Sequence, residues 1–306
     1  MPPNRHENEV ISNGDHYPAA DAVPPPPTDK KLFTPGPMGV SLTTKQAMLR
    51  DVGSRDVEFV NIVRFIRQRL LQVAGKMIDL PACYFVDAMS SFGAVPLDLI
   101  GGCVDFMVSS ANKCIEGVPG FAYTICRTDR LLSYKGVARS LTLDLVEQYL
   151  GLEKDGQFRF TPPTHVILAF CQALCELEQE GGVQGRAKRY QANHKVLQHG
   201  MAALGFKELL DETHDGYIVT SYRFPDHPAF SFEDFYSRLN EKGQAIHPKK
   251  GTKADSFRVA TIGHLFPEDM QHLLHCIQEV CADMGIPLPM KQFPKKSPGK
   301  QLLNLF

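Results

Sequence analysis

The sequence lacks long apolar runs and carries almost no net charge. Its 306 residues include 33 Lys and Arg against 34 Asp and Glu, which gives a formal net charge of −1 at pH 7. Such a balance provides no general attraction to nucleic acid or to a membrane surface. The apolar runs are shorter than the roughly 20 residues that a membrane-spanning helix requires. We therefore expect neither a nucleic-acid-binding nor a membrane protein.

Several motifs that would indicate a particular chemistry are also missing. The eight cysteines include no CxxC pair, the histidines show no HExxH spacing, and there is no GxSxG or P-loop. Metal-dependent, serine-hydrolase and nucleotide-hydrolysing enzymes therefore have no support. Cysteines within apolar runs indicate reduced, buried thiols. The N-terminus has no apolar signal segment and contains acids that transit peptides avoid, so we expect a cytoplasmic protein without a metal site.

Composition divides the chain into two folded parts and two polar ends. With 43% hydrophobic residues, the chain is able to bury a sizeable core. Residues 1–30 are polar and end near four consecutive prolines, which predicts a disordered arm. Residues 290–306 form a lysine-rich basic tail. Between them we expect a large domain over 31–185 and a smaller C-terminal α+β domain over 186–289.

Apolar periodicity places the regular elements between these ends. Apolar residues three and four positions apart predict helices over about 55–73, 164–180, 183–204, 231–242 and 267–280. Thr164 and Ser231 are the expected N-caps of two of them. Short apolar runs bounded by turns predict strands at 84–86, 104–108, 121–126, 217–224 and 257–261. The first three strands are expected to form a largely buried sheet, and the fold class is α/β.

One acid and one lysine follow two neighbouring predicted strands. The run FVDAMSSFG brings Asp87 to the end of one strand, and VSSANK brings Lys113 shortly after the next. A buried carboxylate that keeps a pyridine nitrogen protonated and a buried lysine amine that bonds to an aldehyde suit a pyridoxal 5'-phosphate (PLP) site. Strand-end acids and loop lysines are also common in α/β proteins without a cofactor. Spacing alone therefore leaves a pair of ordinary surface charges open.

Longer stretches resemble a known family. VDAMSSFGAVPLDL, DFMVSSANKCIEGVPGFAYTI and RFTPPTHVILAFCQAL resemble the class V aminotransferases of PLP fold type I, over a region from about Lys31 to about Pro289. Within class V they are similar to the enzymes that move the amino group of 2-aminoethylphosphonate to pyruvate, giving phosphonoacetaldehyde and alanine. The resemblance implies a mainly parallel sheet in the large domain, PLP as cofactor, these two small molecules as substrates, a role in phosphonate metabolism and a homodimer.

The resemblance also implies roles for the two marked residues and their neighbours. Lys113 would be the catalytic residue, bonding to PLP and moving a proton on the substrate carbon, and Asp87 would hold the pyridinium proton. Ser90, Ser110 and Asn112 lie beside them in the sequence and are candidate cofactor contacts. Serines at such positions also cap helices, so this alternative stays open for Ser90.

Four further residues are predicted to bind anionic groups or substrate. Arg258, in an otherwise apolar strand, matches the family arginine that binds the substrate's acidic group, although a strand-end salt bridge is the alternative. Arg139 is a second candidate for the same task. Gly36, in TPGP, would let the backbone approach the substrate closely or simply form a turn. By resemblance, Thr161 crosses a dimer interface to the partner's PLP phosphate, in a segment that precedes a helix N-terminus.

The sequence departs from the family between about Ala74 and Ala82. Seven residues, GKMIDLP, stand where the family has several strands and helices, among them the loop for the PLP phosphate and the aromatic ring that stacks on PLP. A sheet that loses strands exposes an edge. A truncated isoform or pseudoenzyme, impaired or inactive, is therefore the alternative to an active transaminase. Another class V transaminase, such as an alanine–glyoxylate enzyme, also stays open because an arginine binds carboxylate and phosphonate alike.

Overall fold

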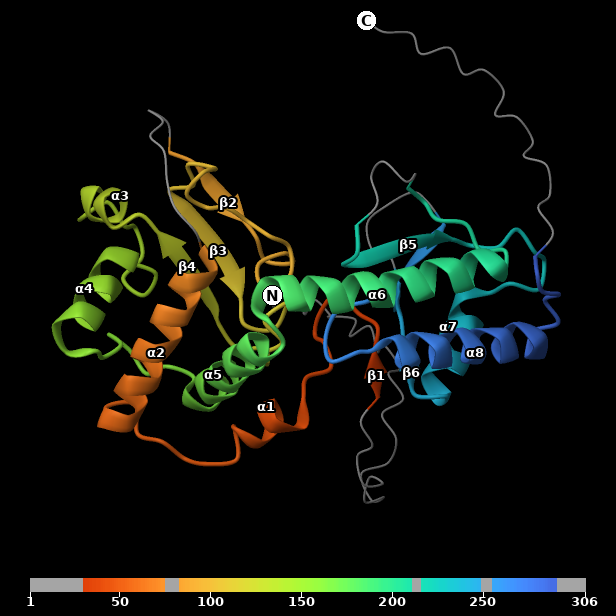
Figure 1. Cartoon of the computed structure of the whole chain (residues 1–306), viewed down its shortest axis with the longest axis horizontal. Helices are drawn as coiled ribbons and strands as arrows, with labels where there is room; N and C mark the ends of the chain where they lie inside the picture. The colour runs from red at the N-terminus through yellow and green to blue at the C-terminus, as the bar shows by residue number, and fades with distance from the viewer. Residues whose placement is uncertain (1–29, 75–82, 211–215, 249–254, 291–306) are drawn as a thin grey trace, which may run out of the picture.

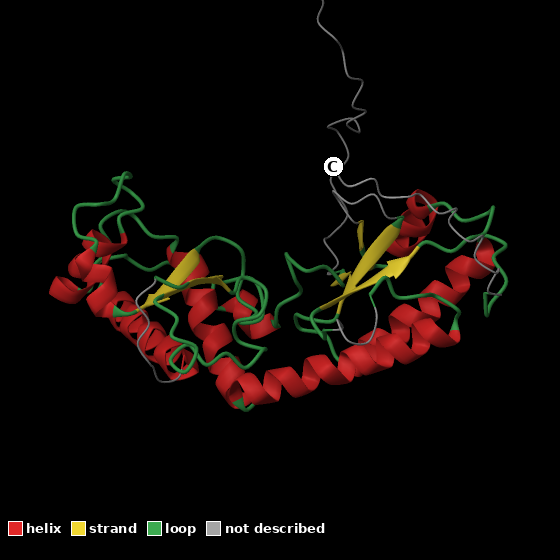
Figure 2. Cartoon of the chain, turned by 90° about the horizontal axis from the view of Figure 1, so that it is seen from above, coloured by secondary structure: helices red, strands yellow, loops and turns green. Residues whose placement is uncertain are grey.

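The computed structural model describes residues 30–74, 83–210, 216–248 and 255–290. The predicted arm (1–30) and basic tail (290–306) lie outside these residues except for their innermost residue, and the GKMIDLP segment lies outside them entirely. The described chain forms two lobes that are connected through one long helix (Figures 1 and 2). No helix in these ranges is both long enough and apolar enough to cross a membrane.

The N-terminal lobe is a small sheet with helices packed against it. The sheet has the order β2-β3-β4, and β2 runs parallel to β3 whereas β4 runs antiparallel to it. Its strands are β2 (Phe85–Asp87), β3 (Phe106–Ser110) and β4 (Ala122–Cys126). The helices of this lobe are α1 (Leu42–Gln46), α2 (Val57–Ala74), α3 (Thr128–Ser133), α4 (Leu145–Asp155) and α5 (Thr164–Gln179).

The apolar periodicity of the sequence explains how α2 and α5 pack. Val63, Ile66 and Leu70 of α2 repeat at helical spacing and are buried on one face. They share a core with Met107 of β3 and Phe170 of α5. The two helices pack against each other and, with the sheet, enclose the core of this lobe.

The expected largely buried sheet is wrong for strand β2. The side chain of Phe85 is 58% exposed, and Asp87 is exposed as well. In β3, by contrast, Met107 and Ser109 are buried. Within the described chain β2 is the outer strand of the sheet, and no described strand pairs with its free edge. An outer strand with an exposed apolar side chain is what a sheet that has lost strands would show, and the loss of strands itself stays a prediction.

The C-terminal lobe combines antiparallel strands with three helices. Its main sheet has the order β5-β8-β7, and a second, two-stranded sheet pairs β1 with β6 in parallel. The strands are β1 (Lys31–Leu32), β5 (Val219–Arg223), β6 (Gln244–Ala245), β7 (His247–Pro248) and β8 (Ser256–Ala260). The helices are α6 (Gly182–Ala203), α7 (Phe232–Glu241) and α8 (Pro267–Asp283).

The start of the described chain packs in the C-terminal lobe. Through β1 and the fully buried Phe33 it joins the core that contains Leu197 of α6 and Phe257 of β8. The division of the chain into domains at 185 and 186 stays a prediction, and helix α6 runs continuously across that position. Helix α6, about 33 Å long for its 22 residues, begins beside the N-terminal lobe and runs along the C-terminal lobe (Figures 1 and 2).

One of the two predicted helix caps is confirmed. The Ser231 side chain accepts a hydrogen bond from the Asp234 backbone at the start of α7. Thr164 does not cap α5, because it is the first helical residue and Pro163 occupies the N-cap position without a side-chain hydrogen bond.

A small buried cluster lies between the lobes. It contains Met38 of the N-terminal segment, Cys114 after β3, Tyr190 of α6 and Ala260 of β8, together with Ala94 and Ile262. Residues from both lobes therefore meet beside Lys113.

Candidate active site

Lys113 lies in the turn that follows β3, against the N-terminal segment. Its Nζ donates a hydrogen bond to the Pro35 carbonyl at 2.6 Å. A Cβ atom added to Gly36 would lie 2.0 Å from this Nζ, so the amine occupies the space that a side chain would fill. Burial lowers the pKa of Lys113 below its ordinary value of 10.5, against a smaller opposing effect of Cys114. Desolvation of this kind increases the neutral, nucleophilic fraction of an amine.

Asp87 lies at the same end of the parallel strands as Lys113, but it is not buried. It pairs with Val108 in the parallel ladder, and the carboxyl ends of parallel strands share one edge. Its Oδ1 accepts a hydrogen bond from the Met89 backbone N–H at 3.0 Å. The expectation of a buried acid is wrong, because β2 is the outer strand of the described sheet.

The three polar residues near this pair differ in their surroundings. Ser110 ends β3, and its Oγ is buried without a hydrogen-bond partner among the described residues. Asn112 is half-buried beside Lys113. Ser90 is exposed, and its carbonyl accepts a hydrogen bond from the Cys114 thiol at 3.2 Å. A buried hydroxyl without a partner, three residues before the lysine, is a position where a polar ligand would complete the hydrogen bonding.

Arg258 lies on β8 and faces the inter-lobe cluster. Residues two apart on a strand share a face, so Arg258 lies on the side of Ala260, which is buried in one cluster with Cys114. Arg258 Nη2 lies 3.3 Å from His247 Nδ1. Because a guanidinium only donates, this imidazole nitrogen accepts. The Arg258 Nε is buried and has no hydrogen-bond partner in the part of the chain that the structure describes, so the guanidinium retains donor capacity for an anion.

Thr161 and Arg139 lie away from Lys113 and Arg258. Thr161 is exposed and lines a pocket of about 350 Å³ with Ser54, Arg55 and Arg159, two of which are cationic. Arg139 is exposed in the segment between α3 and α4, at the opposite end of the molecule from β5 (Figure 1). None of the hydrogen bonds and ion pairs described for the chain joins either residue to Lys113 or Arg258. Their predicted binding roles stay predictions.

Sequence reasoning missed a buried ionic group beside Lys113. Glu116 is 2% exposed and contacts Arg186, Arg189 and Tyr190 of α6. The signal in the sequence is the spacing of the three α6 residues, since positions i, i+3 and i+4 share one helix face. Glu116 itself, in a loop after an apolar strand, carries no comparable pattern.

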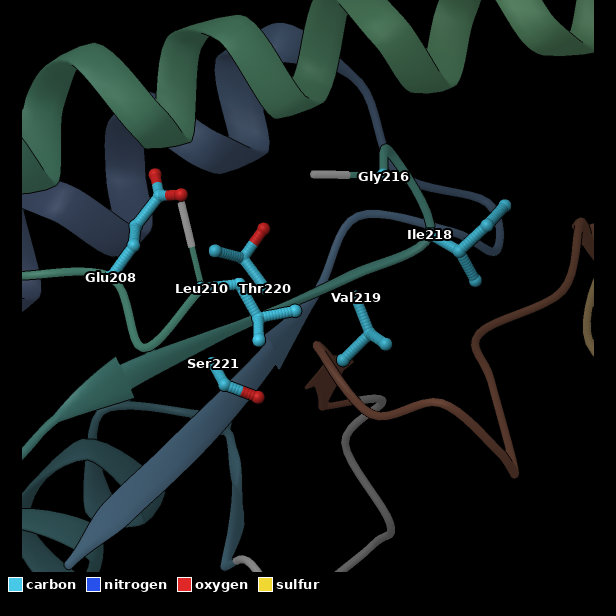
Figure 3. Close-up of a pocket in the computed structure, with 7 residues that line it drawn as sticks. All are labelled: Glu208, Leu210, Gly216, Ile218, Val219, Thr220 and Ser221. Atoms are coloured by element: carbon cyan, nitrogen blue, oxygen red, sulfur yellow. The ribbon is translucent and has the colours of Figure 1, made fainter. Parts of the chain in front are cut away.

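A separate pocket of about 230 Å³ lies beside β5, away from these residues (Figure 3). Its lining includes Glu208, Ile218 and Thr220, and none of the predicted site residues. Within the described ranges no cluster of three or more His, Cys, Asp or Glu side chains is placed to hold a metal ion.

Solved structures show the fold of the chain. Ureidoglycine–glyoxylate aminotransferase of Bacillus subtilis matches with a TM-score of 0.75 at 14% identity, over 88% of this chain and 96% of that one. Alanine–glyoxylate aminotransferase of Nostoc sp. matches with a TM-score of 0.73 at 16% identity, over 89% and 99%. The protein has the α/β fold of the PLP-dependent transferases of fold type I, as predicted.

The sequence places it more narrowly. The family Aminotransferase class-V matches residues 68–256, and the chain belongs to this family. It is 52% identical over 196 residues to the 2-aminoethylphosphonate–pyruvate transaminase of Phocaeicola vulgatus, covering 64% of this chain and 54% of that protein. It is 48% identical over 203 residues to the enzyme of that name from Syntrophobacter fumaroxidans, covering 66% and 55%. The chain spans about half the length of the curated relatives it matches. The predicted resemblance is confirmed.

Proposed function

We propose that the chain is a PLP-dependent transaminase that moves the amino group of 2-aminoethylphosphonate to pyruvate. The observation that carries the proposal is the Lys113 amine, which is held against Pro35 and Gly36 with a lowered pKa. The family membership implies PLP, and the names of the curated relatives support the two substrates. The buried Ser110 hydroxyl without a partner fits a polar group bound beside this lysine.

Each residue of the site has a task in this proposal. PLP, when bound, supplies the electron sink that makes a C–H bond of the substrate acidic. Lys113 Nζ would hold the cofactor and, once the substrate amine has displaced it, would move the proton at the substrate carbon. Burial lowers the pKa of Lys113 and so increases the neutral fraction of this amine. Asp87 holds the proton on the ring nitrogen, and Ser110 and Asn112 orient the cofactor. Ser90, which is exposed, would contact the cofactor through its hydroxyl.

The substrate's acidic group has a separate binding residue. Arg258 would bind phosphonate or carboxylate oxygens through donors that include the unpartnered Nε. Gly36 would let the backbone approach the substrate, and Arg139 is the second anion-binding candidate. Thr161 would contact the phosphate of the partner's PLP in a homodimer, where Arg55 and Arg159 favour an anion.

An impaired, truncated member of the family is the second candidate. The observation that favours it is the exposure of Asp87 on the uncovered strand β2. Water competes with the ring nitrogen for a solvated carboxylate, so such a carboxylate would stabilise the proton on that nitrogen less. The match covers only about half the length of each of these curated relatives, which favours the same alternative.

The test begins with cofactor binding. Purified chain mixed with PLP should develop a visible absorbance band, and borohydride should fix the cofactor on Lys113 in peptide mass spectra. Lys113→Ala should lose both signals, whereas Lys188→Ala, a change of an exposed lysine, should keep them. Absence of the band in the unsubstituted chain would overturn the enzyme proposal.

Product analysis then separates the candidates. Formation of alanine from 2-aminoethylphosphonate and pyruvate supports the proposed reaction. Cofactor binding without alanine formation supports the impaired form, and faster turnover with alanine and glyoxylate would reassign the substrates. Sedimentation of the PLP-loaded chain tests the homodimer.

A further inference from the structure

The turn that carries Lys113 ends in a residue with unusual backbone geometry. Glu116 has φ +65°, in the left-handed region, although it is not glycine. Its backbone N–H donates to the Lys113 carbonyl at 2.7 Å, so the conformation of Glu116 and the place of Lys113 are linked directly. A non-glycine residue persists in this region only where its surroundings hold it there.

The surroundings that hold Glu116 come from α6. Its Oε1 accepts hydrogen bonds from Arg189 Nη2 at 2.7 Å and from the Tyr190 hydroxyl, and it lies 3.3 Å from Arg186 Nη1. The same Arg186 nitrogen donates to the Cys114 carbonyl at 2.6 Å, next to Lys113. Burial raises the pKa of Tyr190 well above its ordinary value, so this hydroxyl remains a donor. A buried carboxylate without such partners would be strongly destabilising.

The same α6 residues bind the loop that follows β8. Arg189 Nη1 donates to the Gly263 carbonyl at 2.7 Å and to the Leu265 carbonyl at 2.9 Å. The Tyr190 hydroxyl accepts from the Gly263 backbone N–H at 3.1 Å. This loop begins directly after the strand of Arg258. Arg189 and Tyr190 therefore touch both the Lys113 turn and the loop beside the substrate-binding strand.

The N-terminal segment links the loop after β8 back to Lys113. The His264 backbone N–H donates to the Gly39 carbonyl at 2.7 Å. Four residues before Gly39, the Pro35 carbonyl accepts the hydrogen bond from Lys113 Nζ. These contacts form a closed ring from the Lys113 turn through α6, the loop after β8 and the N-terminal segment back to Lys113. Glu116 is the residue of the Lys113 turn that contacts α6. Glu116 Oε2 faces His264 Nδ1 at 4.0 Å.

We propose that Glu116 is a positioning residue whose buried carboxylate, bound by Arg189 and Tyr190, sets the lysine amine relative to the C-terminal lobe that carries Arg258. It touches neither cofactor nor substrate in this scheme and acts through the Lys113 turn. The inference rests on the proposed function in taking Lys113 as the catalytic lysine.

The experiment compares Glu116→Gln with Glu180→Gln. Glu180 binds the same two arginines, through Arg186 Nε at 2.6 Å and Arg189 Nε at 2.8 Å, and has no described contact with the lysine turn or the 263–265 loop. Both variants remove one negative charge from the same ion-pair group. The readout is the pH midpoint of acetylation of Lys113, followed by peptide mass spectrometry on the full chain without PLP, alongside the thermal unfolding midpoint.

The direction of the shift distinguishes positioning from simple electrostatics. Loss of a nearby negative charge lowers the pKa of a lysine, whereas loss of its buried position raises it toward the ordinary value. Glu116→Gln should raise the Lys113 midpoint by about half a pH unit or more, given the usual coupling between contacting groups. Glu180→Gln should leave it within about 0.2 unit. A midpoint that falls or stays in Glu116→Gln, or rises equally in both variants, would overturn the proposal.

A second variant, which changes no charge, tests the proposal if Glu116→Gln does not fold. Tyr190→Phe removes only the hydroxyl that joins Glu116 to Gly263, and it should raise the midpoint in the same direction by a smaller amount. An unchanged midpoint in Tyr190→Phe contradicts the proposal. Because acetylation needs no cofactor or substrate, a shift in a chain that makes no alanine would fault the proposed function alone. Normal alanine formation without a shift would fault the inference alone.

Discussion

At the scale of single residues, the site depends on how closely Gly36 and Lys113 pack. The lysine amine lies where a Cβ at position 36 would be, and Gly36 itself has φ +144°, a conformation that L-residues rarely adopt. The glycine is therefore needed for two independent reasons, space and backbone conformation.

We predict that Gly36→Ala costs about 1–3 kcal/mol of unfolding free energy and displaces Lys113. Borohydride trapping of PLP on Lys113 should fall with it. The matched control is Gly39→Ala, where a new Cβ meets nothing within 4 Å, and where the change should be within about 0.5 kcal/mol. Urea unfolding and peptide mass spectrometry of the trapped product measure the two effects. Equal stability and equal trapping in both variants would contradict the close packing.

The lowered pKa of Lys113 predicts the pH dependence of its chemistry. In the folded chain its acetylation midpoint should lie below 10.5, and below the midpoint of the same lysine in urea. Between the two values the unfolded chain binds more protons, so the Lys113 contribution to the unfolding free energy rises with pH and is complete near 10.5. Lys113→Met should flatten this part of the stability profile. A folded-state midpoint at or above 10.5 would show that the amine is not desolvated.

At the scale of elements, one carboxylate fixes α1 to α5. Glu176 of α5 accepts hydrogen bonds from Ser41 Oγ at 2.6 Å, from Thr44 Oγ1 at 3.2 Å, and from Thr43. Burial opposes ionisation of Glu176, but these hydroxyl donors outweigh it and hold its pKa below the ordinary value of 4.5. The segment so anchored begins two residues after Gly39, so α5 indirectly supports the N-terminal segment against Lys113.

Glu176→Gln should therefore lower the unfolding free energy at pH 7 by about 1–3 kcal/mol. Because the folded-state pKa is lowered, the stabilising contribution is present above pH 4.5 and is lost as the pH falls through the folded-state value, so the two stability curves should converge in acid. Glu178→Gln is the control on the same helix. It breaks only the exposed pair with Arg69 and should cost less than about 1 kcal/mol. Curves that stay parallel down to low pH would contradict the assignment.

At the scale of the whole molecule, the two lobes differ in how well their sheets are covered. The central strand of the C-terminal sheet, β8, has Phe257 and Val259 fully buried and pairs on both sides with β5 and β7. Strand β2 pairs on one side only and exposes Phe85. Stability is therefore distributed unevenly along the chain.

Amide hydrogen exchange should resolve this difference. We expect the amides of β2 to exchange at least about tenfold faster than those of β8, since exposed edge strands open locally at low cost. The exchange rates should be the same at every protein concentration of a dilution series, which controls for association between copies of the chain. Protection of β2 equal to that of β8 would contradict an exposed edge.

The sequence alone determined five of the helices, five of the strands and the ancestry of this protein, whereas it did not predict α1, α3, α4, β1, β6 and β7. Helix α2 follows from Val63, Ile66 and Leu70 at helical spacing, and the motifs around Asp87 and Lys113 were sufficient to predict the class V family and its fold. These features are readable because periodicity and short motifs are local properties of the chain. The roles of the individual site residues remain predictions from the same motifs.

Only the tertiary structure decided where the chemistry-bearing groups lie. Asp87 is exposed at the end of β2, the outer strand of the described sheet, although the sequence around it predicts a buried acid. Lys113 meets Pro35, and Glu116 meets Arg189, across 78 and 73 positions of sequence. Such contacts depend on how both lobes pack around the buried cluster of Cys114, Tyr190 and Ala260. Packing is a property of the whole chain, and it alone places the lysine amine against a glycine and links its turn to a buried carboxylate.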